Sequence, residues 1–252
     1  MANQPYRVTV FSTSTTRARP ITTSETPATI EDAAVLARKA AIVKRMRSSF
    51  LGILSITTII YATANAVPYL NPVRQEGLAP LSETLPRVVG VEDRTKVPGY
   101  NRDAFGNWAP VAGTCTTRDM VIFSQSPNAA DCTEKMPTVF DPYAQEAINA
   151  DDIEVDHIFP LSAAWDHGAH AWDSATLRQF ANDPLNLVAT SRAENQDKSD
   201  ALPNEWLPPH PSARCWYSER VAAVATAYEL TLSEETIATM HRQCQLGILF
   251  TR

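Results

Sequence analysis

A run of 26 residues without a charged side chain, between Arg47 and Arg74, divides this chain into a lead and a body. The apolar core of the run covers only twelve residues, 50–61, whereas a helix that spans a bilayer needs about 20. Basic residues precede this core at 44–47, and the small residues Ala-Asn-Ala follow it at 64–66. Basic, apolar and small residues in this order are typical of a secretory signal peptide. We therefore predict export of the protein, with cleavage after residue 66.

The length of the lead leaves two interpretations open. Either Met46 is the true start, or the lead is a cytoplasmic tail and the signal stays uncleaved as an anchor. We expect residues 1–47 to form a basic, disordered lead and residues 48–66 to form the signal peptide or signal-anchor. A proline-rich linker is expected at 67–85, followed by a single folded domain at 86–252.

Charge is distributed unevenly along the chain. The formal net charge is -6, but residues 1–47 carry +5 and the remainder carries -11. An acidic body argues against a protein that coats nucleic acid through a broad basic surface. The apolar content of 44% also excludes a wholly disordered chain. A globular protein with one small site, at which a metal ion offsets phosphate charge, remains compatible with this distribution.

All four cysteines lie after the apolar run, and their number is even: Cys115, Cys132, Cys215 and Cys244. In an exported chain, two disulfides are the default expectation. Three connectivities are open. We favour Cys115–Cys132 and Cys215–Cys244, because each pair closes a loop of short or moderate length.

A zinc site is the alternative use of the last two cysteines. His210 and His241 lie near Cys215 and Cys244, so these four side chains offer a complete set of zinc ligands. The chain contains no Cys-x2-Cys pair, which argues for disulfides.

A strand, a second strand and a helix are predicted in succession. Residues 153–159 are rich in β-formers and end at Pro160, and 185–190 resemble a second strand. A capping box then starts a helix at Ser191 that runs to about residue 199. Further helices are predicted at 174–181, at 217–229 and from 233 onward, whereas the pattern at 119–124 fits either a strand or a helical turn.

Polar side chains gather on this strand–strand–helix unit. Asp156 and His157 lie on the first strand, Asn186 opens the second, and Asn195 and Lys198 share a face of the helix. Carboxylate and amide oxygens suit Mg²⁺ and similar cations, and a neutral imidazole can take a proton from water. A metal ion and a base are together what phosphodiester hydrolysis requires.

These residues resemble the HNH endonucleases, which have a ββα-metal fold. The resemblance is carried by Asp-His-Ile-x-Pro-Leu at 156–161, Asn-Leu at 186–187 and Asn-x-x-Lys at 195–198. It is closer to the branch that forms the C-terminal domain of GmrSD-type restriction enzymes and occurs in small exported actinobacterial proteins. Further matches extend it over roughly residues 85–240, at 99–108, 115–118, 165, 180–184, 206–209 and 215–217. The fold class implied is α+β, with a ββα-metal (HNH) core in a single disulfide-stapled domain with flanking helices.

The resemblance also implies a role for each site residue. His157 would be the general base that activates water, and Asp156 would ligate the metal. Asn195 would be the second ligand, in a position that histidine often holds in the family. Asn186 would orient the loop that carries His157, and Lys198 would face phosphate. An asparagine ligand favours Mg²⁺ or Mn²⁺ over softer metals.

Strand geometry places a condition on this assignment. Successive side chains of a strand point to opposite faces, so Asp156 and His157 can reach one site only if the strand bends or ends there. Pro160 favours such an ending.

Two arginines are candidates for binding substrate phosphate, Arg118 and Arg178. Ion pairs with nearby acids, such as Asp119 or Asp183, account for them equally well.

The function that we predict is an exported, metal-dependent endonuclease that hydrolyses DNA with little sequence preference. Two alternatives stay open. One is an RNase or a toxin nuclease, for which an immunity protein would be the partner. The other is a binding module on the cell surface with a dead nuclease fold. The chain lacks the nucleotide-hydrolysing domain of the large restriction enzymes, so we expect no nucleotide cofactor, and we expect a monomer.

Overall fold

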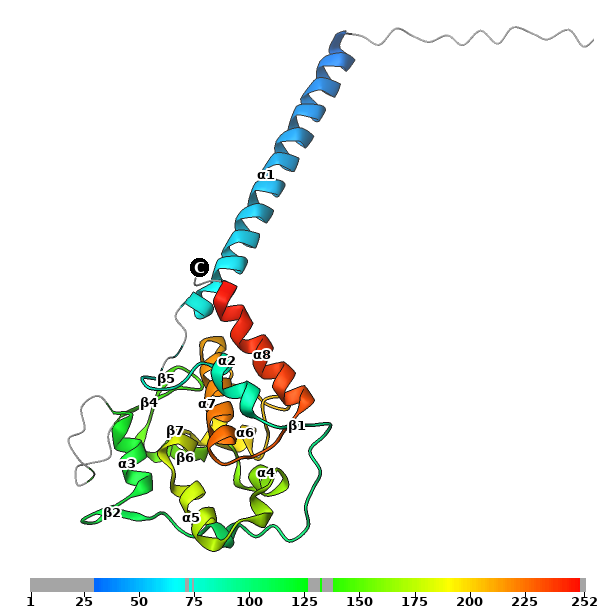
Figure 1. Ribbon diagram of the computed structural model, residues 1–252. Helices are drawn as coiled ribbons and strands as arrows, with labels where there is room; N and C mark the ends of the chain where they lie inside the picture. The colour runs from blue at the N-terminus through cyan, green and yellow to red at the C-terminus, as the bar shows by residue number, and fades with distance from the viewer. Residues whose placement is uncertain (1–29, 71–72, 74, 127–131, 133–137, 250–252) are drawn as a thin grey trace, which may run out of the picture. The chain divides into compact units, whose positions relative to one another are not determined.

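The computed structural model describes residues 30–70, 73, 75–126, 132 and 138–249 (Figure 1). Two compact units divide the chain, Met1–Thr58 and Ile59–Arg252. The first described element is helix α1 (Ile30–Leu70). Its first half corrects the prediction of a disordered lead, because 30–47 is helical and rich in the strong helix formers Ala, Leu, Arg and Lys. The lead before residue 30 lies outside the described residues.

The apolar core at 50–61 lies within α1, where its large side chains are exposed. Among the described residues, no helix combines the length and the apolar character that crossing a membrane requires.

The described residues of the second unit combine helices with four short strand pairs. Its helices are α2 (Leu81–Thr84), α3 (Thr117–Ser124), α4 (Leu161–Asp166), α5 (Ser174–Asn182), α6 (Arg192–Lys198), α7 (Arg214–Ala227) and α8 (Glu234–Leu249). Its 3-10 helices are η1 (Leu85–Arg87), η2 (Arg102–Phe105), η3 (Ala150–Asp152), η4 (Ala169–Ala171), η5 (Pro184–Asn186) and η6 (Pro211–Ala213). Its strands are β1 (Gly90–Val91), β2 (Pro110–Ala112), β3 (Cys115–Thr116), β4 (Val139–Asp141), β5 (Glu146–Ile148), β6 (Ile153–His157), β7 (Leu187–Ser191) and β8 (Leu232–Ser233). The α+β class that we predicted is therefore present.

The end of the predicted linker is part of the folded body, which corrects the boundary at residue 85. Residues 81–87 form α2 and η1, and both pack against α7. Leu81 and Leu85 are buried in the core. Their spacing of four residues puts both on one face of a helical turn. This face packs against α7 and is buried.

Strands β6 and β7 form the antiparallel pair that carries the predicted site. Ile153 pairs with Ser191 at one end, and His157 pairs with Leu187 at the other. Helix α6 follows β7 directly, and the Ser191 hydroxyl caps it by accepting from the Glu194 amide. The second strand starts two residues later than predicted, because residues 184–186 form a 3-10 turn that proline favours.

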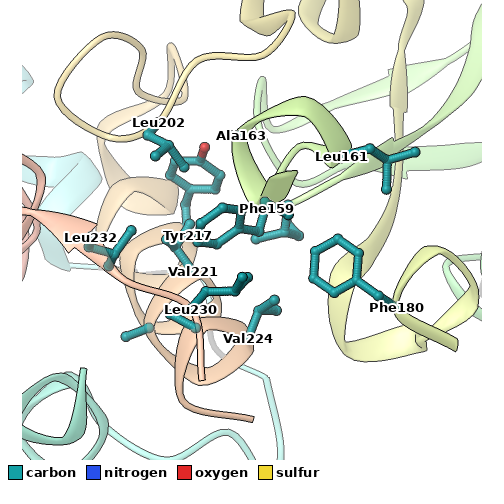
Figure 2. Packing of buried hydrophobic residues seen from close by; sticks show 14 of the residues in the cluster. Phe159, Leu161, Ala163, Phe180, Leu202, Tyr217, Val221, Val224, Leu230 and Leu232 are labelled. Carbon is teal, nitrogen blue, oxygen red and sulfur yellow. The ribbon is translucent and has the colours of Figure 1, made fainter. Parts of the chain in front are cut away.

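Two hydrophobic clusters fix this strand pair in the body. The larger cluster surrounds α7, where Phe159 lies near Tyr217 and Val221 (Figure 2). The smaller one packs α3 against the β6–β7 pair and includes Ile122 and Ile153. The segment 119–124, for which the sequence left strand or helix open, is therefore helical and covers one face of the pair.

Both disulfides that we favoured are present, Cys115–Cys132 and Cys215–Cys244. The second joins α7 to α8 and thereby removes both thiols that the zinc alternative needs. His210 of that alternative instead contacts the Ser212 hydroxyl, at 2.7 Å from Nδ1 to Oγ.

We predict that His167 makes folding sensitive to mild acid. Its ring is buried, with Nδ1 3.0 Å from the Thr231 hydroxyl oxygen. Burial, and then the nearby Arg94, lower its pKa from 6.5 to about 4. Above pH 6.5 the ring is neutral in the folded and unfolded states. As the pH falls from 6.5 towards 4, only the unfolded chain gains the proton, so about 3 kcal/mol of stability is lost.

Urea unfolding at pH 7.5 and at pH 4.5 checks this prediction. His167→Asn keeps a polar group near Thr231 and cannot titrate, so its stability should fall less between the two pH values than that of the wild type. The pKa of His157 is also lowered to about 4, and its contribution remains in both proteins. Identical pH dependence in the two proteins would contradict the prediction.

Candidate active site

The predicted site residues lie on both faces of strand β6. Asp156 faces helix α6, where it contacts Lys198. His157 faces the other way, where it contacts Ala181 of α5 and stacks on Trp108. The strand stays in regular register to its last residue, so the bend that would unite Asp156 and His157 is not present.

Asp156 is the centre of a buried polar cluster. The Lys198 ammonium donates to Asp156 Oδ1 at 3.0 Å and forms an ion pair with Oδ2 at 2.9 Å. It also donates to the main-chain carbonyl of His157, at 2.8 Å. The Tyr143 hydroxyl donates to the second carboxylate oxygen at 2.7 Å. Lys198, which we predicted to face phosphate, is therefore fully buried and serves as the counter-charge of Asp156.

Burial shifts the pKa values of the two members of this pair in opposite directions. It raises the pKa of Asp156 and lowers the pKa of Lys198, because a low dielectric disfavours each charged form. Each charge then opposes the effect of burial on its partner. An ion pair without access to water is sensitive to the loss of either member, since the remaining charge would be buried alone.

The predicted metal ligand Asp156 is occupied by other partners, and the amide nitrogen of Asn195 is also engaged. Both oxygens of Asp156 accept hydrogen bonds from cationic or hydroxyl donors, and the Asn195 amide donates to Glu154 Oε2 at 2.7 Å. HNH-type nucleases generally use a divalent metal. The Asp156 carboxylate already binds the buried Lys198 ammonium, so it is not available to bind a divalent ion in addition. The arrangement of the described residues therefore does not fit the predicted ligand pair.

A second group of metal-ligating residue types lies elsewhere in the described part of the chain. Ligand atoms of Cys215, Glu219 and Cys244 lie within 4.8 Å of one another. The two sulfur atoms are joined in a disulfide, so they do not provide the thiolates that bind metal. This group is consequently no better suited to a metal ion.

The His157 side chain lines an open cavity of about 140 Å³. Other lining residues are Arg102, Asn107, Trp108, Leu161 and Asn182. Nε2 of the ring lies 3.0 Å from the main-chain oxygen of Ala181. A carbonyl oxygen only accepts, so Nε2 carries the proton and Nδ1 of the neutral ring retains its lone pair.

His157 is neutral at physiological pH. Burial is the main cause that lowers its pKa from 6.5 to about 4; the hydrogen bond to Ala181 acts against this shift, and the positive charges of Arg102 and Lys198 act with it. A neutral imidazole with a free lone pair can accept a proton from water. The cavity therefore combines a proton acceptor with one positively charged side chain, Arg102.

Asn186 holds the chain that follows His157. Its Oδ1 accepts from the Phe159 amide at 2.7 Å, and its Nδ2 donates to the Phe159 carbonyl at 3.2 Å. The buried Arg220 guanidinium fixes the turn around Asn186 by donating to the carbonyls of Pro184, Leu185 and Leu187. Asn186 therefore fixes the main chain two residues after His157.

The cavity has a different arginine from the two that we predicted. Arg118 donates to the Ile153 carbonyl at 3.2 Å, which ties α3 to β6. Arg178 is exposed, and its aliphatic carbons lie against Gly106. Arg102 and Trp108 lie in the stretch 99–108 that contributes to the family resemblance, but no local pattern there indicated contact with His157. Tyr143 likewise had no sequence signal.

We predict that replacing Lys198 destabilises the fold. Lys198→Met leaves the Asp156 carboxylate buried without its counter-charge, which should lower the free energy of unfolding by about 3–5 kcal/mol. The double variant Asp156→Asn/Lys198→Met removes both charges and should recover most of the loss. Urea unfolding at pH 7.5, followed by tryptophan fluorescence, measures both values.

Arg192→Met is the matched control, because Arg192 lies on the same helix as Lys198 but forms a partly exposed ion pair, with Glu154 of strand β6 at 3.2 Å. It should change stability by at most about 1 kcal/mol. A Lys198→Met protein as stable as this control would show that Lys198 is not the structural partner of Asp156.

Comparison with known proteins identifies the relatives of this chain. Residues 125–236 match the family described as GmrSD restriction endonucleases, C-terminal domain. The chain is also 34% identical over 196 residues to an uncharacterized secreted protein of Arthroderma benhamiae, an alignment that covers 75% of this chain and 93% of that protein. No solved structure matches the chain. The family match spans β6, β7 and α6, and the chain therefore belongs to the HNH-like family of GmrSD restriction endonuclease C-terminal domains.

Proposed function

We propose that the protein is an exported endonuclease that hydrolyses DNA phosphodiester bonds with low sequence preference, and that His157 is its general base. Membership of the family indicates a nuclease-type function. The observation that carries the finer proposal is the state of His157, whose neutral ring lines an open cavity with its tautomer set by the Ala181 carbonyl.

His157 would act on a water molecule in the cavity. Nδ1 takes the proton as the water oxygen attacks phosphorus and the bond from phosphorus to the leaving sugar oxygen breaks. The leaving oxygen gains its proton from solvent water, while Nε2 keeps its hydrogen bond to the Ala181 carbonyl. The imidazolium formed in this way is compatible with that bond, because both ring nitrogens then donate. A positioned general base typically accelerates such a step by about 10²–10⁴-fold.

Arg102 would bind the phosphate that His157-activated water attacks. Its side chain lines the same cavity and is exposed to solvent, so substrate can reach it. A guanidinium suits two phosphate oxygens at once. The net charge of -11 after residue 47 favours a contact with few phosphates over a broad basic surface.

Export is supported by three independent features. The relative is named a secreted protein, two disulfides stabilise the body, and the sequence around 44–66 has the order of a signal peptide. Disulfides persist in oxidising compartments. We propose release of the body from the cell, with retention by an uncleaved signal-anchor as the alternative.

We predict that His157→Ala abolishes cleavage. The oxidised protein is incubated with plasmid DNA, with a single-stranded RNA, and with Mg²⁺, Mn²⁺ or EDTA. His157→Ala should lower the rate at least about 10²-fold, and His157→Gln should do the same although it keeps a donor near Ala181. His170→Ala is the control, because His170 is exposed and contacts the Trp165 carbonyl instead.

Three results of this assay would change the proposal. Full activity of His157→Ala would eliminate His157 as the base. Cleavage of RNA alone would change the substrate class to RNA. Binding of nucleic acid without turnover, by a folded protein under every metal condition, would support the binding-module alternative.

We predict that Arg102→Gln weakens substrate binding. Loss of one phosphate contact should raise KM for DNA about tenfold and reduce the slope of log affinity against log salt by about 1. Arg178→Gln is the matched control, because it removes an exposed arginine that neighbours the same loop but is not among the cavity residues. Equal effects of the two substitutions would mean that general surface charge, and not Arg102, accounts for binding.

A further inference from the structure

The indole of Trp108 is stacked in parallel orientation beside the imidazole of His157. The two ring centroids are 5.7 Å apart and the ring planes differ by only 6°. Trp108 is partly buried and lines the same cavity as His157. No sequence pattern assigned a role to this tryptophan.

A stacking contact of this kind can fix the orientation of the plane of an imidazole. The second side-chain torsion of histidine is broad and has no sharp staggered minimum, so the covalent structure leaves the ring plane loosely defined. The hydrogen bond from Nε2 to the Ala181 carbonyl fixes one atom of the ring. Rotation about that bond would still move Nδ1, and the stacked indole blocks this rotation.

The segment that carries Trp108 is itself tied to the rest of the cavity. Asn182 Oδ1 accepts from the Ala109 amide at 2.7 Å, and Asn182 Nδ2 donates to the Asn107 carbonyl at 3.2 Å. The Thr117 amide donates to the Ala109 carbonyl at 2.8 Å. The residues on both sides of Trp108 are therefore held by hydrogen bonds.

Two successive residues at the end of α5 thus restrain the imidazole from different directions. Ala181 does so directly through its carbonyl, and Asn182 does so indirectly, by holding the segment of Trp108 against the ring.

We propose that Trp108 is a positioning residue that fixes the plane of the His157 imidazole, so that Nδ1 is aimed at the attacking water. This inference rests on the proposed role of His157 as the base. Trp108 itself takes no proton and forms no bond with substrate, so its contribution is confined to the geometry of His157. A misplacement of about 1 Å at a reacting group lowers rates by about 10²-fold.

The test compares Trp108→Leu with Trp108→Phe in the full chain. Leucine removes the aromatic face, so kcat for plasmid cleavage should fall about 10- to 100-fold with little change in KM. Phenylalanine can still stack, so Trp108→Phe should retain most of kcat. Trp172→Leu is the control, because Trp172 is also partly buried but makes its ring contacts, both tilted, with Phe180 and Tyr228.

A second measurement does not depend on turnover. In NMR spectra of the His157 ring, the proton shifts caused by the Trp108 ring current should disappear in Trp108→Leu and persist in Trp172→Leu. If these shifts are absent from the wild type, the stacking does not exist and the inference fails, whatever the activity. If His157→Ala is fully active while the shifts are present, the role of His157 as base fails instead.

The kinetic outcomes are equally decisive. An unchanged kcat in Trp108→Leu, or a rise in KM alone, would overturn the positioning role, the latter because Trp108 would then contact substrate. Equal losses in Trp108→Leu and Trp108→Phe would also overturn it, since an aromatic face would then not be what matters.

Discussion

The buried ion pair of Lys198 and Asp156 is the interaction on which the arrangement of the site depends. It joins helix α6 to strand β6, and the same ammonium holds the main-chain carbonyl of His157. Two charges without contact with water are tolerated only because their donors and acceptors are matched, with Tyr143 completing the set. The end of β6 is therefore constrained from the side opposite to the cavity.

The alternation of side chains along β6 then places Asp156 and its neighbour His157 on opposite faces. With β6 regular to its last residue, Asp156 belongs to the interior and His157 to the open cavity. The sequence places both side by side, and the family pattern assigns both to one catalytic site. In the structure, the carboxylate stabilises the scaffold while the imidazole lines the cavity, and the positive charge near the cavity comes from Arg102.

The sequence predicted what depends on local pattern or on family resemblance. Strand β6, helix α6 with its Ser191 cap, and both disulfide pairings agree with expectation. The sequence did not predict that Trp108 contacts His157 or that Tyr143 contacts Asp156. These contacts join segments that are distant in the sequence, and no periodic pattern marks either residue. Lys198 was placed on the correct helix face, but a pattern of faces does not distinguish an exposed lysine from a buried one.

The restraints on His157 also have a thermodynamic consequence. Its main chain is bonded to Lys198, and its ring is bonded to Ala181 and stacked on Trp108. A side chain with no remaining rotamer freedom loses no conformational entropy when substrate arrives. The entropy loss of ordering the His157 side chain therefore occurs during folding, and it does not reduce the affinity of the cavity for a ligand.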